Sequence, residues 1–233
     1  MRLSVFGLSL VSCIVIMSLQ QARAQDQTAT PFAEEVHVFA MEDEIFPPEP
    51  CGTLFVGSSS IRFWFRLADD FAGERVIRRG FGGSTIADVN FYFEQMVRQY
   101  QPARIVFYAG ENDLNTGRSP EDVFQDFMRF MSLKDAALGS APVYFVSVKP
   151  SVARISDLSQ QEFLNQKIER LAEERGDLAY IDVASPMLED GLPAPDLFVS
   201  DRLHMNARGY DIWRKEILTA LNEDGVTLAQ YCR

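Results

Sequence analysis

The sequence predicts a three-layer α/β/α sandwich around a five-stranded parallel sheet. From Thr53 onward, five short apolar runs rich in β-branched and aromatic residues alternate with longer segments that have helical spacing. Strands that are too short and too apolar to alternate between polar and apolar residues are typical of parallel sheets covered by helices on both faces. No internal repeat or low-complexity tract interrupts the pattern, so one fold class accounts for it.

The expected strands are the five apolar runs. They span Thr53 to Gly57, Val76 to Arg79, Ile105 to Tyr108, Val143 to Val148 and Leu178 to Ile181. Between them, three apolar stripes recur at helical spacing, and we interpret them as the core faces of helices. The stripes are Ile86, Val89, Phe93, Met96 and Val97, then Val123, Phe124, Phe127, Phe130 and Met131, then Phe163, Ile168 and Leu171.

Residues 1–24 predict a secretory signal peptide. Arg2 is followed by an apolar run from Leu3 to Leu19 and by the small-x-small sequence Ala22-Arg23-Ala24, which predicts cleavage after Ala24. Export to a periplasm or beyond the cell is therefore expected, with no stable membrane insertion after cleavage. An uncleaved membrane anchor and a lipoprotein modified at Cys13 are the alternatives.

Removal of residues 1–24 leaves 209 of the 233 residues, which is enough for one domain with a substantial core. Residues 25–50 are a polar, acidic lead-in with one short helix expected from about Phe32 to Phe39. Within this lead-in, Glu42-Asp43-Glu44 is interpreted as a solvated charge run. Residues 51–233 make up the expected domain.

Charge and cysteine content restrict the partners and the compartment. The signal segment holds two of the 22 Lys and Arg and no acid, so 20 basic residues stand against 33 Asp and Glu, a net charge of −13. This charge argues against nucleic acid or an anionic membrane as a partner, because phosphate attraction requires a basic face. In a compartment where disulfides persist, a Cys51–Cys232 bridge is favoured over two unpaired buried thiols.

Four polar clusters fall at or near the carboxyl ends of the expected strands, where open parallel sheets bind ligands. Each cluster alone is as typical of a turn or a helix cap as of a site. The four together, in this order, favour a site. They are Gly57-Ser58-Ser59-Ser60, Gly80-Phe81-Gly82-Gly83-Ser84, Gly110-Glu111-Asn112-Asp113 and Ser200-Asp201-Arg202-Leu203-His204.

These motifs resemble, in residue type and order, those of the SGNH hydrolase family, the GDSL-type esterases and lipases. The resemblance extends from Cys51 to about Leu221 and implies the flavodoxin-like SGNH hydrolase fold. It departs at Ser58, where the family's namesake motif has aspartate, which puts the support of that turn in doubt. The roles that the resemblance implies are a nucleophile at Ser59, a catalytic triad completed by Asp201 and His204, and an oxyanion hole of Ser59, Gly83 and Asn112.

The chemistry of the residue types agrees with these roles. A serine hydroxyl needs a base within hydrogen-bond reach, and imidazole can accept and return its proton. Of the two histidines, His37 lies in the acidic lead-in, whereas His204 precedes the last helix with Asp201 three positions earlier. A carboxylate at that offset can orient the imidazole ring. Backbone N–H groups at Ser59 and Gly83 and an uncharged amide at Asn112 are suitable donors to an oxyanion.

Other chemistries lack their residues. The chain has no Gly-x-Ser-x-Gly elbow, dinucleotide fingerprint or phosphate-binding loop. Two histidines with scattered acids do not make a catalytic zinc site, and no cofactor is expected. Lys149-Pro150-Ser151, after the fourth strand, is interpreted as a loop with a solvated lysine.

The resemblance thus implies a serine esterase that hydrolyses carboxylic esters through an acyl-enzyme. No long apolar lid insertion interrupts the helices, which favours short acyl or O-acetyl groups, including carbohydrate-borne ones. A small-molecule or carbohydrate ester is the expected partner. Two alternatives stay open, a non-catalytic carbohydrate or cell-envelope binding module on the same scaffold and an acyltransferase that passes the acyl group to another hydroxyl.

Overall fold

A computed structural model describes residues 30–223 of the chain. The chain divides into two compact units, 1–34 and 35–233. In the first, the backbone N–H of Ala33 donates to the Thr30 carbonyl at the start of α2 (Ala33–Ile45). The expected signal peptide, Cys13 and Cys232 lie outside the described residues, so signal cleavage and the Cys51–Cys232 bridge remain predictions.

The second unit is built on a five-stranded parallel sheet with strand order β2-β1-β3-β4-β5. The expected α/β fold class is therefore confirmed, and all five expected strands form. Their ends differ from the expected ones by at most two residues. The strands are β1 (Thr53–Gly57), β2 (Val76–Gly80), β3 (Arg104–Tyr108), β4 (Val143–Val146) and β5 (Leu178–Ile181). A small antiparallel pair, β6 (Leu188–Glu189) and β7 (Leu192–Pro193), lies apart from this sheet.

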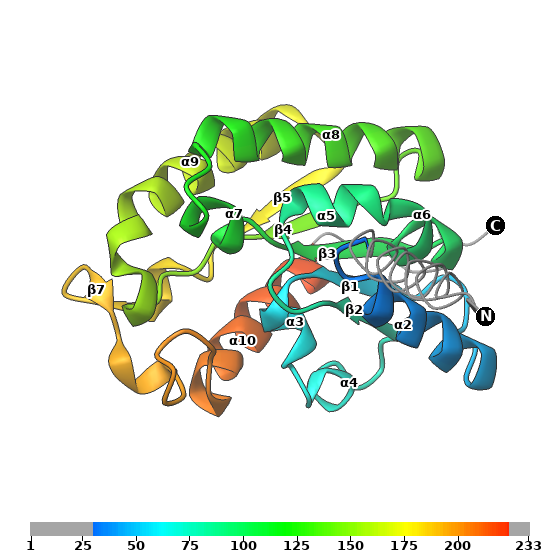
Figure 1. Cartoon of the computed structure of the whole chain (residues 1–233), viewed down its shortest axis with the longest axis horizontal. Coiled ribbons are helices and arrows are strands. Elements are labelled where there is room, and N and C mark those ends of the chain that lie inside the picture. Colours follow the sequence, from blue (N-terminus) through cyan, green and yellow to red (C-terminus); the bar gives the residue numbers. More distant parts are fainter. Residues whose placement is uncertain (1–29, 224–233) are drawn as a thin grey trace, which may run out of the picture. The chain divides into compact units, whose positions relative to one another are not determined.

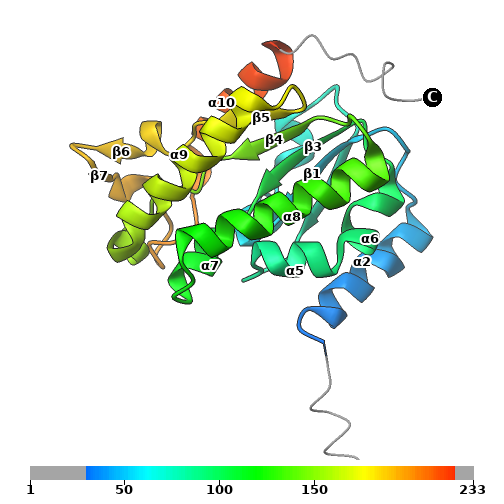
Figure 2. The same ribbon diagram turned by 90° about the horizontal axis from the view of Figure 1, so that it is seen from above.

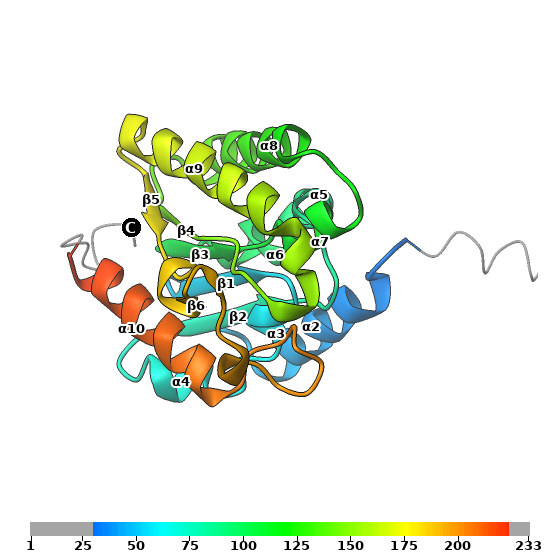
Figure 3. The same cartoon turned by 90° about the vertical axis from the view of Figure 1, so that its left-hand side faces the viewer.

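Helices cover both faces of the sheet, as the view in Figure 3 shows. The helices on one face are α5 (Ile86–Phe91), α6 (Phe93–Met96), α8 (Pro120–Leu138) and α9 (Leu158–Glu174), and α8 and α9 run along the strands in Figure 2. On the other face lie α3 (Ser59–Arg62), α4 (Leu67–Asp70) and α10 (Ala207–Glu223). The short α7 (Glu111–Asn115) lies at the strand ends, on the side of α8 and α9 (Figure 1). Short 3-10 turns occupy Arg98–Tyr100, Val152–Asp157, Ser185–Met187 and Pro195–Leu197.

The apolar stripes of the first two helical segments are largely buried as expected, but the third was wrong in part. Phe163 is 50% exposed, and α9 instead buries Leu164 and Ile168 together with the polar Gln161 and Asn165. Asn165 bonds the backbone of Val148 through both ends of its amide, at 2.8 and 3.0 Å. Because two of the buried positions of α9 are polar, the apolar pattern of the sequence does not reveal which face of this helix is buried.

Helix α2 is longer than the expected short helix. Asp43 is not part of a solvated charge run, which corrects that interpretation, because its carboxylate forms an ion pair with the buried Arg79. The same carboxylate accepts a hydrogen bond from the Tyr100 hydroxyl at 2.6 Å. From Glu35 onward, α2 is thus fixed to the end of β2. Over residues 30–223, no helix has the length and apolarity required to cross a membrane.

Candidate active site

The carboxyl ends of three neighbouring strands bring the first three polar clusters together. In the sheet register, Gly57 of β1 pairs with Gly80 of β2 and with Tyr108 of β3. The chain therefore leaves all three strands at the same level. The strand order places β1 and β3 at the topological switch point, where α/β sheets bind their ligands.

Gly57 is required for this convergence. Its φ is +140°, and a Cβ built there would lie 1.7 Å from the Tyr108 carbonyl oxygen. The close approach lets the N–H of Ser58 donate to that oxygen at 2.9 Å. The turn after β1 is thereby tied to β3, and Ser59 follows as the first residue of α3.

The structure brings Ser59, His204 and Asp201 into one hydrogen-bonded chain. His204 Nδ1 lies 2.7 Å from Asp201 Oδ2, and His204 Nε2 lies 2.9 Å from Ser59 Oγ. Because an ionised carboxylate can only accept, Nδ1 carries the proton, and Nε2 is left to accept from the serine hydroxyl. This is the order of contacts that activates a serine nucleophile.

The Asp201 carboxylate is held in its ionised form. Partial burial alone would raise its pKa, but hydrogen bonds from the His204 ring and from the N–H groups of His204 and Leu203 outweigh that effect and lower the pKa to about 2. Both N–H groups donate to Oδ1 at 2.9 Å. One oxygen of Asp201 thus fixes the backbone of the loop while the other holds the imidazole.

The loop that carries His204 is supported on several sides. Val199 N–H donates to the His204 carbonyl at 2.9 Å, and Phe198 forms an antiparallel bridge with Met205. Lys149 Nζ donates to the Leu203 carbonyl at 2.9 Å. The half-buried ring of Phe63 meets the imidazole edge-on, with ring centroids 4.8 Å apart. These contacts fix the plane of the imidazole toward Ser59.

The expected oxyanion donors lie on the α5 and α7 side of Ser59. The Ser59 N–H begins α3 and so has no partner within the helix. Gly83 has a φ of +82°, which favours glycine, and no atom lies within 4 Å of a Cβ built on it. One N–H of the Asn112 amide donates to the Ser84 carbonyl at 2.9 Å, which leaves the second N–H for another acceptor.

Beneath Asn112 lies a buried charged cluster. Lys149, which is 0% exposed, lies 3.0 Å from the Glu111 carboxylate, so the expectation of a solvated lysine was wrong. Burial lowers the Lys149 pKa below its ordinary value, and Glu111 offsets part of that shift. Tyr108 and Ser151 also donate to Glu111, at 2.9 and 3.2 Å. Each buried charge is therefore paired, as burial requires.

Arg154 links this cluster to Asn112. Its Nη2 donates to Asn112 Oδ1 at 2.9 Å, and its Nη1 lies 3.8 Å from Glu111 Oε1. Sequence reasoning missed Arg154 and also Phe63. A basic residue shortly after a strand end was the only signal for Arg154, and Phe63 is one of three aromatic residues in Phe63-Trp64-Phe65 with no distinguishing position.

The remaining groups do not extend the site. His37 is exposed on α2, away from these contacts. Over residues 30–223, no three His, Cys, Asp or Glu side chains gather in a way that could hold a metal ion.

A family profile described as the GDSL-like Lipase/Acylhydrolase family matches residues 54–212. No curated protein gives a significant match. A GDSL-like lipase from Bacteroides thetaiotaomicron is 23% identical, with a TM-score of 0.70 over 81% of this chain and 97% of its own. A mutant acetyl esterase with an acetate ion is 14% identical, with a TM-score of 0.58 over 74% of this chain and 97% of its own. A carbohydrate esterase of family 3 from Talaromyces cellulolyticus is 17% identical, with a TM-score of 0.59 over 74% of this chain and 97% of its own.

Proposed function

The chain belongs to the GDSL-like Lipase/Acylhydrolase family, and we propose that it hydrolyses carboxylic esters through an acyl-enzyme on Ser59. The observation that carries the proposal is the hydrogen-bonded chain from Asp201 through His204 to Ser59, with contacts of 2.7 and 2.9 Å. A binding module has no need of a base directed at a hydroxyl, so this geometry favours the enzyme over that alternative.

In the proposed reaction, Ser59 Oγ attacks the ester carbonyl carbon while His204 Nε2 takes the hydroxyl proton. The carbonyl oxygen becomes negative and accepts hydrogen bonds from the N–H groups of Ser59 and Gly83 and from the free N–H of Asn112. His204 then gives its proton to the leaving alkoxide, and the alcohol departs. Asp201 holds the ring and stabilises the imidazolium at each stage.

Water completes the cycle. His204 removes a proton from a water molecule, which attacks the acyl carbon of the Ser59 ester, and the same proton returns to Ser59 Oγ as the acid leaves. A short acyl group such as acetyl is the proposed substrate group, in keeping with the names of two structural neighbours, an acetyl esterase and a carbohydrate esterase. We also propose that the protein is exported from the cytoplasm, on the basis of the predicted signal peptide alone.

The test is turnover of p-nitrophenyl acetate by the purified protein and by Ser59→Ala. We expect the variant to lose at least about 10³-fold in kcat/KM, since the nucleophile is removed while the scaffold stays intact. Circular dichroism and thermal unfolding check that the variant folds. Equal turnover by both proteins, or none by the wild type toward acetyl to octanoyl esters and acetylated sugars, would contradict the proposal.

Transfer of the acyl group to another hydroxyl would use the same residues. Product analysis with added alcohol acceptors distinguishes it from hydrolysis. Free acid as the main product at moderate acceptor concentration is the outcome expected of the proposed hydrolase.

A further inference from the structure

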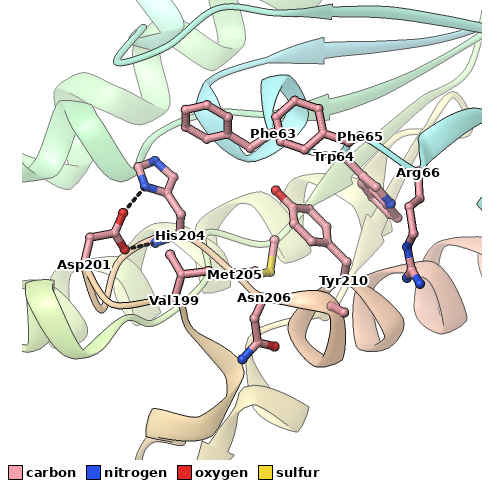
Figure 4. A pocket seen from close by; sticks show the side chains of 11 residues that line it. Phe63, Trp64, Phe65, Arg66, Val199, Asp201, His204, Met205, Asn206 and Tyr210 are labelled. Carbon is pink, nitrogen blue, oxygen red and sulfur yellow. Dashed lines mark hydrogen bonds and ion pairs between the residues drawn. The ribbon is translucent and has the colours of Figure 1, made fainter.

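A cavity of about 550 Å³ lies beside His204 (Figure 4). It opens between the segment that follows Ser59 and the loop that carries His204, with His204 at one end and Arg66 at the other. Its apolar lining comes from both segments. The lining side chains are Phe63, Trp64, Phe65, Val199, Met205 and Tyr210.

The polar groups on the loop wall of this cavity are already engaged. The Asn206 amide donates to the carbonyls of Asp196 and Phe198, at 2.7 and 3.2 Å, and its oxygen accepts from the N–H groups of Arg208 and Gly209, at 2.9 and 3.3 Å. Asn206 therefore fixes the loop and has no remaining bond to offer a ligand.

Most polar groups on the other walls are engaged as well, with Arg66 the exception. The Tyr210 hydroxyl donates to the Ser60 carbonyl at 2.9 Å, and Arg66 pairs with Asp211 at 2.8 Å through Nη2, so its other N–H donors remain at the end of the cavity away from His204. Both Asp201 oxygens accept from the His204 loop. The surface that the cavity offers to a ligand is thus mainly carbon, which is suited to an apolar group and not to one covered with hydroxyls.

The position of the cavity decides which half of an ester it can hold. The leaving alkoxide must receive its proton from His204 Nε2, so the alcohol half has to lie on the His204 side of the reacting carbon. The oxyanion donors Gly83 and Asn112 lie on the α5 and α7 side and do not line the cavity. The cavity is therefore next to the base and away from the oxyanion donors.

We infer that this cavity binds the alcohol half of the substrate and that this half is an apolar group, aromatic or alkyl, larger than a few carbon atoms. The inference rests on the proposed function and departs from the expectation that carbohydrate-borne esters are included. Phe63 and Phe65 supply the main contact surface, because aromatic rings provide large apolar area with little rotamer entropy to lose.

The test compares acetates that share the acyl group and differ in the alcohol. Ethyl, cyclohexylmethyl and benzyl acetate are paired with a methyl xyloside acetylated at one hydroxyl. We expect kcat/KM for the cyclohexylmethyl and benzyl esters to exceed that for ethyl acetate by at least about 10-fold, the order of discrimination an apolar pocket provides. The xyloside should resemble ethyl acetate or be slower.

Phe65→Ala supplies the structural arm of the test. We expect it to lower kcat/KM for benzyl acetate about 10-fold more than for ethyl acetate, because the lost contact is with the alcohol group. Phe46→Ala is the matched control, because Phe46 is 79% exposed against 78% for Phe65. Phe46 follows α2 directly and does not line the cavity, so its substitution should leave kcat/KM for both esters unchanged.

The outcomes separate this inference from the proposed function. Three results, each with turnover that depends on Ser59, would overturn the inference and leave the proposed esterase in place. They are a preference for the xyloside, no preference among the alcohols, and an equal effect of Phe65→Ala on all esters. A lack of Ser59-dependent turnover for every ester would overturn the proposed function and this inference with it. Thermal unfolding of Phe65→Ala excludes a folding defect.

Discussion

Arg154 controls the orientation of a side chain whose two ends look alike. An asparagine amide can present either its oxygen or its nitrogen to a substrate, and only the nitrogen donates to an oxyanion. Arg154 donates to the Asn112 oxygen at 2.9 Å, while the Ser84 carbonyl accepts from the nitrogen at the same distance. Both contacts enforce the donating orientation, so Arg154 is a positioning residue for the proposed oxyanion hole.

Arg154→Gln is expected to lower kcat on p-nitrophenyl acetate about 10- to 100-fold with little change in KM, since a misoriented Asn112 fails chiefly in the transition state. Arg154→Lys keeps the charge and should recover part of the loss. Steady-state kinetics of both variants provide the measurement. A rise in KM at constant kcat would instead mean that Arg154 contacts the substrate directly.

The residues of the proposed triad could be predicted from sequence because their motifs resemble those of the SGNH hydrolase family in residue type and order. His204 was one of two histidines, and Asp201 stood at a spacing that can orient its ring. Phe63, Lys149 and Arg154 could not be predicted in the same way. Their roles depend on contacts with residues far away in the chain, such as His204, Leu203 and Asn112.

Helix α5 begins beside the proposed oxyanion donors, and two sets of hydrogen bonds fix its N-terminus. Thr85 and Asp88 form a capping box, and the fully buried Asp113 accepts from the Ile86 N–H at 3.1 and 3.3 Å. Burial raises the Asp113 pKa to about 6, although the Ile86 N–H lowers it in part. The segment that carries Gly83 is thus anchored to α7 through a carboxyl group that titrates near neutral pH.

The sign of the pH effect follows from that shift. Because the folded pKa of Asp113 lies above its unfolded value, its contribution to stability is fully present below about pH 4 and is lost as pH rises through about 6. The total is on the order of 3 kcal/mol, from about two pKa units. Urea unfolding at several pH values gives the free energy of unfolding of the wild type and of Asp113→Asn. The wild-type value minus the variant value should fall as pH rises from about 4 to about 6. A difference that does not change with pH would contradict the role given to Asp113.

At the level of elements, strands were easier to predict than helix faces. Strands β1, β3 and β4 are buried along their whole length, so the apolar run of each is continuous and indicates where the strand lies. Helix α9 buries Gln161 and Asn165, and polar residues on a core face erase the hydrophobic period. Strand β4 ends two residues early because the Val148 N–H bonds the Asn165 side chain, a tertiary contact that no local pattern contains.

Across residues 35–223, one buried ion pair joins both halves of the proposed machinery. Glu111 begins the helix that presents Asn112, and Lys149 follows β4 and holds the Leu203 carbonyl next to His204. Displacement of the pair would therefore disturb the oxyanion side and the base together. The 0%-exposed Lys134 offers a comparison, since it pairs with Asp177 at the opposite ends of the strands.

Lys149→Met should lower the free energy of unfolding by about 3 kcal/mol, because it leaves the buried Glu111 carboxylate with only the more distant Arg154 as a cationic partner. The double variant Lys149→Met/Glu111→Leu should lose less than the sum of the single variants. Urea unfolding provides these values. Under conditions where both variants are folded, Lys149→Met should also have a lower kcat, whereas Lys134→Met should be less stable but keep its kcat. An equal loss of kcat in both variants would contradict the proposal that Lys149 supports both sides of the site.

The hydroxyl of Ser59 and the ring of His204 meet across 145 positions of the chain. Closing so long a loop costs entropy that is recovered only when the first strand and the last helix are both in place. Collapse and helix formation can precede that meeting, but the proposed reaction cannot. After dilution from denaturant, recovery of the proposed esterase activity should therefore report completed assembly, because a compact but partly refolded molecule would have no activity.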